Sequence, residues 1–283
     1  MKRIEGAKRG EAKFERISWD DALDMIAGKM LPGCSVCYNV EKNNGHSYRL
    51  SYMDVWKDND VFKRKYQQSL TEDIDPTVQY YDLRFGNLCN LSCRSCYSGA
   101  SSQFDKDVRD LQKYTNIIKF HGVNDFDLNS WYETSTFDEN INSQLSNMTE
   151  YYCTGGEPTL IDKNYEILQR MIDTGHSKHI DLKFNTNLTN AKKDFYSLFP
   201  YFRQVRAMMS VDGTYDLQEY LRYPSKWSQI SKNIQKLVDM NLDSMLLTIT
   251  PVLQTTNINR ITELFDYIED INKSVNRTAI HIT

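Results

Sequence analysis

Three cysteines, Cys89, Cys93 and Cys96, stand close together in the segment LRFGNLCNLSCRSCYSG. Their C-x3-C-x2-C spacing allows one tight loop to present three thiolates to a single metal centre. A [4Fe–4S] cluster is bound by thiolates, one on each iron. Three protein ligands leave the fourth iron open to a substrate. The sequence therefore predicts a catalytic cluster with one vacant iron at these cysteines.

Zinc binding is the first alternative for these cysteines, with a fourth ligand such as His121 or Cys153. Zinc sites more often pair their ligands as C-x2-C with a second, distant pair. A chance group of buried thiols is the second alternative. The spacing favours the cluster over both. None of the five histidines stands at a metal-ligand spacing from another.

From residue 76 on, short β-rich segments alternate with amphipathic helical segments, which is typical of an α/β fold with a parallel sheet. Strands are expected at 78–85, 149–154, 179–185, 205–211, 245–251 and 278–283. One helix is expected after Asp162, with Gly175 as its stop, and two more around 230–238 and 258–268. The carboxyl ends of parallel strands share one edge, where ligands bind. Because the cysteine loop follows the first strand, we expect the site at that edge.

The segment 1–75 differs in character and is expected to form a small irregular or helical N-terminal domain, ahead of an α/β domain over 76–283. Within it, Ser18 is a good N-cap for a helix that ends before Pro32. The sequence stops at its sixth strand. We therefore expect either a C-terminal truncation or an unusually short version of the fold.

Polar motifs follow the later strands in chain order. They are Gly155-Gly156-Glu157-Pro158 after the second strand, Asn185 and Asn187 at the third, Ser210 and Asp212 at the fourth, and then Arg222. Each motif alone is as often a turn or a surface charge as a ligand site. Together, and behind a C-x3-C-x2-C loop, they resemble the radical S-adenosylmethionine (SAM) superfamily. The resemblance extends in order from the cysteine loop to the end of the chain.

The resemblance implies a fold and two cofactors. The fold is a partial (βα)6 barrel of the TIM type, and the cofactors are a [4Fe–4S] cluster and SAM. The amino group of SAM is expected at the GGEP element, where Glu157 can accept from the ammonium. The ribose and carboxylate of SAM are expected beside Ser210 and Asp212, with Arg222 against the carboxylate.

Two further positions are assigned to the cofactor by the same resemblance. Asn185 and Asn187 match the polar strand tip that family members place beside it. An aromatic residue usually precedes the third cysteine, near the adenine. Here Ser95 occupies that position and Tyr97 follows the cysteine instead, so Tyr97 is the aromatic candidate for the adenine.

The resemblance also implies a reaction. The reduced cluster passes one electron to SAM, which yields methionine and a 5′-deoxyadenosyl radical, and that radical abstracts hydrogen from a substrate. We expect an enzyme, an oxidoreductase or a transferase, whose unknown substrate has a peptide or protein as its candidate. An electron donor such as flavodoxin or ferredoxin is the implied partner. Trp131 and Tyr132, in an insertion over 105–148, are candidate substrate contacts, with a packed surface helix as the alternative.

Two other functions compete with this one. A non-catalytic or zinc-binding degenerate relative would act as an interaction module, and Ser95 and the abrupt C-terminus favour it. A radical enzyme that modifies RNA is the other. The net charge of -4 and the pI near 5.8 argue against it, and against binding to nucleic acid or an anionic membrane.

Targeting segments are not expected. No stretch approaches 18 consecutive apolar residues, and the basic start lacks the apolar region of a secretory signal. We therefore expect a cytoplasmic protein whose six cysteines are metal ligands or buried thiols rather than disulfides.

Cys34 and Cys37 form a separate C-x2-C pair directly after Pro32-Gly33. Their setting resembles radical SAM proteins with SPASM or twitch domains, in which such cysteines bind an auxiliary iron–sulfur cluster. Those members use further cysteines outside the barrel, and only Cys153 remains here, inside the second strand. An auxiliary cluster from this chain alone would be incomplete. A zinc half-site or a free thiol pair is the alternative.

Overall fold

The computed structural model describes residues 35–48, 78–114, 131–189 and 195–283, with short pieces at 2–3, 14–15, 29, 50–51, 54, 63, 67–68 and 71. Contacts divide the chain into two compact units, Met1–Pro76 and Thr77–Thr283. In the first unit, β1 (Lys2–Arg3) pairs antiparallel with β2 (Phe14–Glu15), and α2 spans Ser35–Lys42. Cys37 lies in α2. Cys34 lies outside the described residues, as does the helix expected after Ser18 apart from Lys29.

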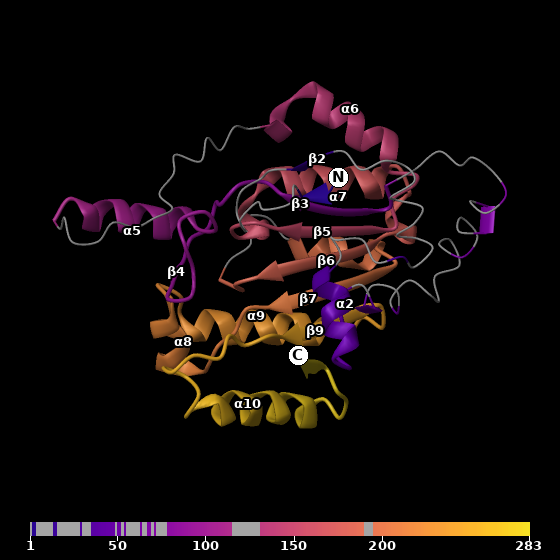
Figure 1. The fold of residues 1–283 in the computed structure, drawn as a ribbon. Coiled ribbons are helices and arrows are strands. Elements are labelled where there is room, and N and C mark those ends of the chain that lie inside the picture. Colours follow the sequence, from indigo (N-terminus) through magenta and orange to yellow (C-terminus); the bar gives the residue numbers. More distant parts are fainter. Residues whose placement is uncertain are drawn as a thin grey trace. The chain divides into compact units, whose positions relative to one another are not determined.

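Six parallel strands form the main sheet of the second unit, in the order β10-β9-β7-β6-β5-β3 (Figure 1). They span Tyr80–Arg84 (β3), Glu150–Thr154 (β5), Asp181–Thr186 (β6), Gln204–Met209 (β7), Met245–Ile249 (β9) and Ile280–Ile282 (β10). All six expected strands are thereby confirmed, and so is the expected α/β fold. The strands cross the sheet in chain order, so successive crossovers run in the same direction.

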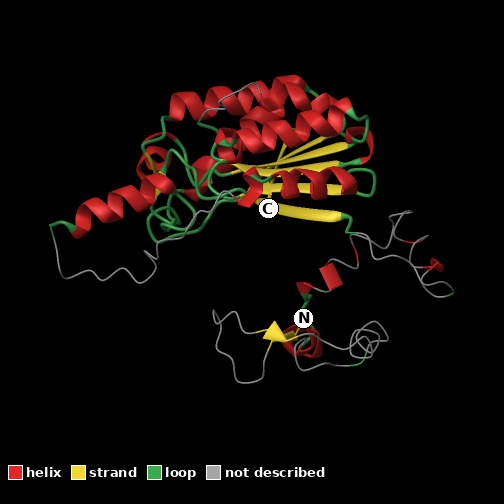
Figure 2. Ribbon diagram, turned by 90° about the horizontal axis from the view of Figure 1, so that it is seen from above, coloured by secondary structure: helices red, strands yellow, loops and turns green. Residues whose placement is uncertain are grey.

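Most of the long helices lie along one side of these strands (Figure 2). Parallel crossovers are right-handed, so strands that advance in one direction send their helices to one face. The helices span Ser102–Gln112 (α5), Ser135–Gln144 (α6), Asp162–Asp173 (α7), Tyr215–Leu221 (α8), Trp227–Met240 (α9) and Ile261–Ser274 (α10). Short 3-10 turns span Trp131–Glu133 (η2), Pro158–Leu160 (η3), Ser177–His179 (η4) and Phe195–Tyr201 (η5). None of the described helices has both the length and the apolar character needed to cross a membrane.

The three helices expected from periodicity are α7, α9 and α10. In α7 the apolar side chains of Ile167, Leu168 and Met171 are fully buried, as their spacing predicts. Gly175 follows this helix with a φ of 74°, a left-handed conformation in which a side chain is strained. The expected stop is therefore confirmed.

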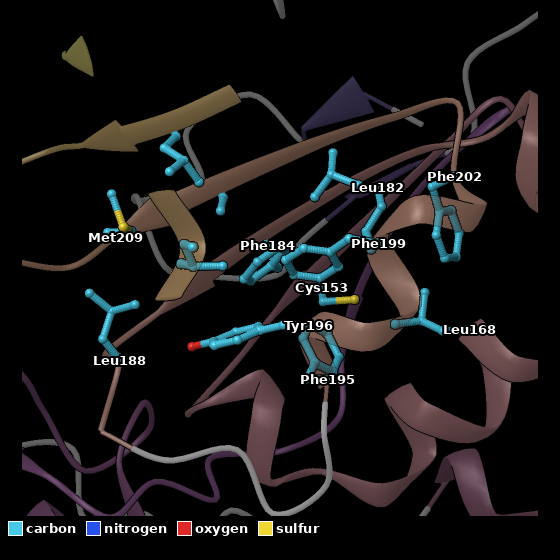
Figure 3. Close-up of a cluster of buried hydrophobic side chains, with 14 of the residues drawn as sticks. Cys153, Leu168, Leu182, Phe184, Leu188, Phe195, Tyr196, Phe199, Phe202 and Met209 are labelled. Carbon is cyan, nitrogen blue, oxygen red and sulfur yellow. The ribbon is translucent and has the colours of Figure 1, made fainter. Parts of the chain in front are cut away.

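The helix-covered face of the sheet is apolar. Figure 3 shows Phe184 of β6 packed with Phe195 and Phe199, and their ring centroids lie 5.1 to 5.8 Å apart. Cys153 of β5 is buried in the same core, and its burial raises the pKa of its thiol. Truncation of one such phenylalanine typically costs about 3–5 kcal/mol of folding free energy. This core fixes the strands whose ends carry the site.

The opposite face of the sheet is polar, and we call it the open face. It is formed by the alternate residues Tyr80, Asp82, Arg84, Glu150, Tyr152, Thr154, Asp181, Lys183, Asn185, Gln204, Arg206, Met208, Leu246, Thr248 and His281. Only Glu150 and Thr248 of these are buried. A barrel of successive β and α elements turns this face inward, beneath the carboxyl ends of its strands.

Candidate active site

The carboxyl ends of four neighbouring strands bring the expected motifs to one edge of the sheet. β3 leads into the cysteine loop, which we define as residues 85–99, and β5 leads into the segment 155–158. β6 ends next to Asn187, and β7 ends next to Ser210. Motifs that are far apart in the sequence are thereby collected at the expected edge.

The cysteine loop is braced by two elements that follow it in the chain. Its short strand β4 (Ser92–Cys93) pairs antiparallel with β8 (Arg222–Tyr223). The hydroxyl oxygen of Ser102, in α5, accepts from the amide of Cys89 and donates to its carbonyl, both at 3.1 Å. These bonds fix the backbone at two of the three cysteines.

The three thiols lie near enough to affect one another. Burial raises the pKa of Cys93 to about 11, the Arg222 guanidinium opposes that rise, and the charges of Cys96 and Cys89 add to it. Burial also raises the pKa of Cys89 and of Cys96. Metal ligation requires the thiolate, so a bound centre displaces protons from this loop.

The donor set fits an iron–sulfur cluster better than a zinc ion. Within the described part of the chain, no three His, Cys, Asp or Glu side chains, the three loop cysteines included, are placed to bind one metal ion. Zinc needs four ligands within about 2.3 Å of one centre. Cys153 belongs to the core, so it does not complete such a site, and His121 lies outside the described residues. Three thiols on one loop match a cluster with one open iron.

Gly155 and Gly156 allow the loop after β5 to lie directly against the cysteine loop. A Cβ on Gly156 would stand 2.2 Å from the carbonyl oxygen of Leu88. Gly155 has a φ of 115°, and its Cβ would stand 2.8 Å from the carbonyl oxygen of Gly86. The amide of Glu157 donates to the Leu88 carbonyl at 2.8 Å. Contact between the two loops is therefore a reason for both glycines that the sequence did not reveal.

The carboxylate of Glu157 joins the tip of β5 to the tip of β6. It accepts from the Thr159 hydroxyl at 2.6 Å, the Thr186 hydroxyl at 2.9 Å and the Asn187 amide at 2.6 Å. The residue is only 1% exposed. Burial raises its pKa, and these donors oppose the rise. A side chain expected at the SAM ammonium is thus engaged within the fold, and its contact with SAM stays a prediction. Buried Pro158 begins the turn η3 beside it.

Asn185 and Asn187 have different surroundings. Asn187 is buried, and its side-chain amide donates to Asn90 at 3.0 Å and approaches the Cys89 sulfur at 3.7 Å. Asn185 is exposed on the open face, where its oxygen accepts from the Tyr152 hydroxyl at 2.6 Å. The Asn187 side chain therefore contacts the cysteine loop, and the Asn185 side chain faces the inside of the barrel.

Asp212 and Arg222 form a buried ion pair at the tip of β7. Nε and Nη2 of Arg222 hold the two carboxylate oxygens at 2.8 and 3.0 Å. Nη1 of the same guanidinium lies 4.0 Å from the Cys93 sulfur. Arg222 and Asp212, which are expected beside the SAM carboxylate, are thus also in contact with the cysteine loop, through Arg222 and Cys93.

Two expected cofactor contacts have side chains that reach the surface of the site. Ser210 is half-buried, and its hydroxyl has no partner among the described residues, although its amide donates to Thr186 at 2.9 Å. Tyr97 is 65% exposed. Neither side chain is committed to the core, so both are available to a ligand.

Three residues that hold Asp212 were not predicted from the sequence. Gln218 accepts from the Asp212 amide, Asn257 donates to its carbonyl, and the amide of Val252 donates to its carboxylate, each at 2.9 Å. No motif marks these positions, because their roles depend on packing between α8 and the loop after β9. Trp131 packs against Phe85 with its centroid 5.8 Å away, which fits the packed alternative for the insertion.

Solved structures resemble this chain only at low identity. A structure of SuiB from Streptococcus suis bound to precursor peptide SuiA has 11% identity and a TM-score of 0.42, and the match covers 83% of this chain and 62% of that one. Native anSMEcpe with bound AdoMet has 15% identity and a TM-score of 0.44, covering 71% and 50%. The chain thus spans about half to three fifths of the length of these proteins.

Family comparison is more specific. No curated protein matches the chain significantly. The model of the Radical SAM superfamily matches residues 83–268, which is more than half of the chain and includes every motif at the edge of the sheet. The family implies a [4Fe–4S] cluster and SAM. This protein belongs to the radical SAM superfamily.

Proposed function

We propose that this enzyme cleaves SAM reductively at a cluster held by Cys89, Cys93 and Cys96, and that it uses the resulting radical on a peptide or protein. The observation that carries the proposal is the position of the cysteine loop. It contacts the Glu157 loop through the Leu88 carbonyl and the Arg222–Asp212 pair through Cys93. A ligand of the open iron would there meet the tips of several strands.

When bound, the cluster supplies the electron that breaks a carbon–sulfur bond of SAM, which gives methionine and the 5′-deoxyadenosyl radical. The chain's own residues would then bind and orient SAM. We assign its carboxylate to the Ser210 hydroxyl and the Arg222 charge, and its adenine to Tyr97. Arg222 keeps the charge near the site because Asp212 holds its guanidinium in place.

Other expected residues would act indirectly. Glu157, Gly155, Gly156 and Pro158 would position the edge of the pocket, since their contacts lie within the two loops. Asn187 would orient Cys89, and Asn185 would face the substrate. Ser210, Arg222 and Tyr97 would thus contact SAM, whereas Glu157 and Asn187 would hold the cysteine loop.

The substrate would meet the radical at the open face. That face is wide, polar and lined by six strands, which suits an extended polar chain. The solved structure of SuiB contains its precursor peptide. The proposal of a peptide substrate for this chain is based on the open face and not on that likeness. A reduced flavodoxin or ferredoxin would supply the electron at the exposed side of the cysteine loop, where Arg94 and Ser95 are exposed.

An auxiliary iron–sulfur site of the SPASM or twitch type is a separate proposal. It would use Cys37, a free and partly exposed thiol in α2, together with Cys34 and ligands beyond these two. Its test is the iron content of the variant Cys34→Ala/Cys37→Ala. If wild type holds more iron than one cluster requires and the variant loses that excess, the auxiliary site is supported. An iron content equal to that of wild type contradicts it.

The main proposal is tested by anaerobic reconstitution with iron and sulfide, followed by SAM and dithionite. Release of 5′-deoxyadenosine, measured by mass spectrometry, is the expected result. Cys93→Ala should abolish it, while Lys232→Ala, a change on the outer surface of α9, should not. A reconstituted wild type that contains its cluster and releases no 5′-deoxyadenosine would contradict the proposal.

A further inference from the structure

Charged side chains on the open face are arranged in rows across the strands. The middle row pairs Asp82 with Tyr152, Tyr152 with Lys183, Lys183 with Arg206 and Arg206 with Leu246, as neighbours in register. Partners in register point to the same face and lie close together. Two cations, Lys183 and Arg206, therefore stand side by side in the middle of the sheet.

The other cations of this face have anionic partners. Lys183 Nζ lies 2.6 Å from a carboxylate oxygen of Glu150. Arg84 lies 3.1 Å from Asp82, which also accepts from the Thr154 hydroxyl at 2.9 Å. These contacts use the acidic groups of the two strands β3 and β5, namely Asp82 and Glu150.

The remaining acid of the face, Asp181, is also engaged. It pairs with Arg203, the residue just before β7, and burial raises its pKa although the Arg203 charge opposes that rise. Each of the three acids of the open face therefore forms an ion pair with a cation other than Arg206, although Oδ1 of Asp181 has no hydrogen-bond partner among the described residues.

Arg206 is the exception in this arrangement. It is exposed, and among the described residues it has no anionic partner. Its neighbours Val205 and Ala207 are fully buried on the opposite face, which fixes the side on which Arg206 emerges. A like charge on the adjacent strand is unfavourable unless an anion lies nearby. The sheet thus presents an unmatched guanidinium inside the barrel.

The distance to the catalytic edge suits an anchor for substrate. Arg206 of β7 precedes Ser210, the residue directly after that strand, by four positions, which is about 13 Å of extended chain. A substrate group held there lies below the SAM site and within a few residues of the reacting atom if the substrate is itself extended.

From this arrangement we infer that Arg206 binds a carboxylate of the substrate, so that the enzyme selects a peptide with an acidic residue near the position it modifies. The inference rests on the proposed function. A planar guanidinium binds a carboxylate through two parallel hydrogen bonds, and Lys183 beside it adds favourable charge. Arg206 is then a specificity-determining residue rather than a member of the SAM site.

Equilibrium capture of peptides tests this inference. The full chain, loaded with its cluster and SAM under anaerobic conditions, is exposed to random peptides with amidated C-termini. One library contains Asp and Glu, and a matched library has Asn and Gln in their place. A third, neutral library with free C-termini separates a terminal carboxylate from an acidic side chain. The variants are Arg206→Gln, Arg206→Lys and, as a matched loss of one exposed charge on the helix side, Lys232→Gln.

Wild type should capture the acidic library about two- to fivefold better than the amide library, the range expected for one solvent-exposed charge pair. Arg206→Gln should remove this preference, Arg206→Lys should retain part of it, and Lys232→Gln should retain all of it. Equal capture of both libraries by wild type, no capture of either, or an unchanged preference in Arg206→Gln would overturn the inference. Preference for the third library alone would show that Arg206 binds the terminal carboxylate of a peptide. That result would overturn the inference that the enzyme selects an acidic side chain. Capture requires no SAM cleavage, so the proposed function can fail or stand independently.

Discussion

Arg222 Nη1 lies 4.0 Å from the sulfur of Cys93, while Nε and Nη2 of the same guanidinium hold Asp212 at 2.8 and 3.0 Å. The side chains of Arg222 and Asp212 are only 11% and 1% exposed. One guanidinium therefore connects the cysteine loop to the tip of β7. Removal of either member of a buried ion pair leaves the other charge without compensation.

Substitution Arg222→Gln should lower the free energy of unfolding of the cluster-free protein by about 3–5 kcal/mol, because Asp212 is left charged and buried. The double variant Arg222→Gln/Asp212→Asn should lose less than the sum of the two single variants, because it removes both charges. Urea unfolding of the four proteins measures this coupling. Additive losses would contradict a direct role for the ion pair.

Substitution Gly156→Ala should separate the two loops, because its Cβ would stand 2.2 Å from the Leu88 carbonyl oxygen. Gly175→Ala is a matched control, since nothing lies within 4 Å of its Cβ and only its φ of 74° is strained. The control should cost about 1–2 kcal/mol. Gly156→Ala should cost more in urea unfolding and should also retain less iron. Equal effects of the two variants on iron content would contradict the loop contact.

Substitution Asn187→Ala should shorten the lifetime of the cluster in air, because it removes the amide that approaches the Cys89 sulfur at 3.7 Å. Asn185→Ala is the comparison two positions earlier, where the side chain bonds to Tyr152 instead. The decay of visible absorbance after exposure to air measures both. Matching decay rates for the two variants would show that Asn187 has no special role at the loop.

Glu157 should make the stability of the cluster-free protein depend on pH. Burial raises its pKa in the folded state, so the folded protein holds this proton more tightly than the unfolded chain. That stabilisation is fully present below the unfolded pKa and is lost as pH rises through the folded pKa. The stability of wild type relative to Glu157→Gln should therefore fall as pH rises from 4 toward 7, by urea unfolding at each pH. Parallel curves for the two proteins would refute this.

Strand and helix positions could be predicted from the sequence because the spacing of apolar residues indicates which residues of an element are buried. Leu182 and Phe184, or Ile230 and Ile234, are buried at the spacing that marks a strand or a helix. The common edge followed as well, since the topology of a parallel sheet determines which strand ends meet.

Side-chain partners did not follow, because they depend on contacts between distant segments. Cys93 and Arg222 are separated by 129 positions, and Glu157 and Asn187 by 30. The two-residue strands β4 and β8 are too short to leave a periodic pattern. The role of Arg206 could not be predicted from the sequence for a related reason. Its lack of an anionic partner becomes apparent only once the register of the neighbouring strands is known.

The most direct test of the central claim is electron–nuclear double resonance on the reduced, cluster-loaded enzyme with SAM labelled at its amino nitrogen and carboxylate. The account predicts at least the roughly four irons per chain of one [4Fe–4S] cluster and a coupling from both labels, which shows SAM on the open iron. Cys89→Ala, Cys93→Ala and Cys96→Ala should each lose the cluster, while Cys153→Ala should keep it. A full cluster without coupling from either label, or a cluster that survives loss of a loop cysteine, would contradict the account.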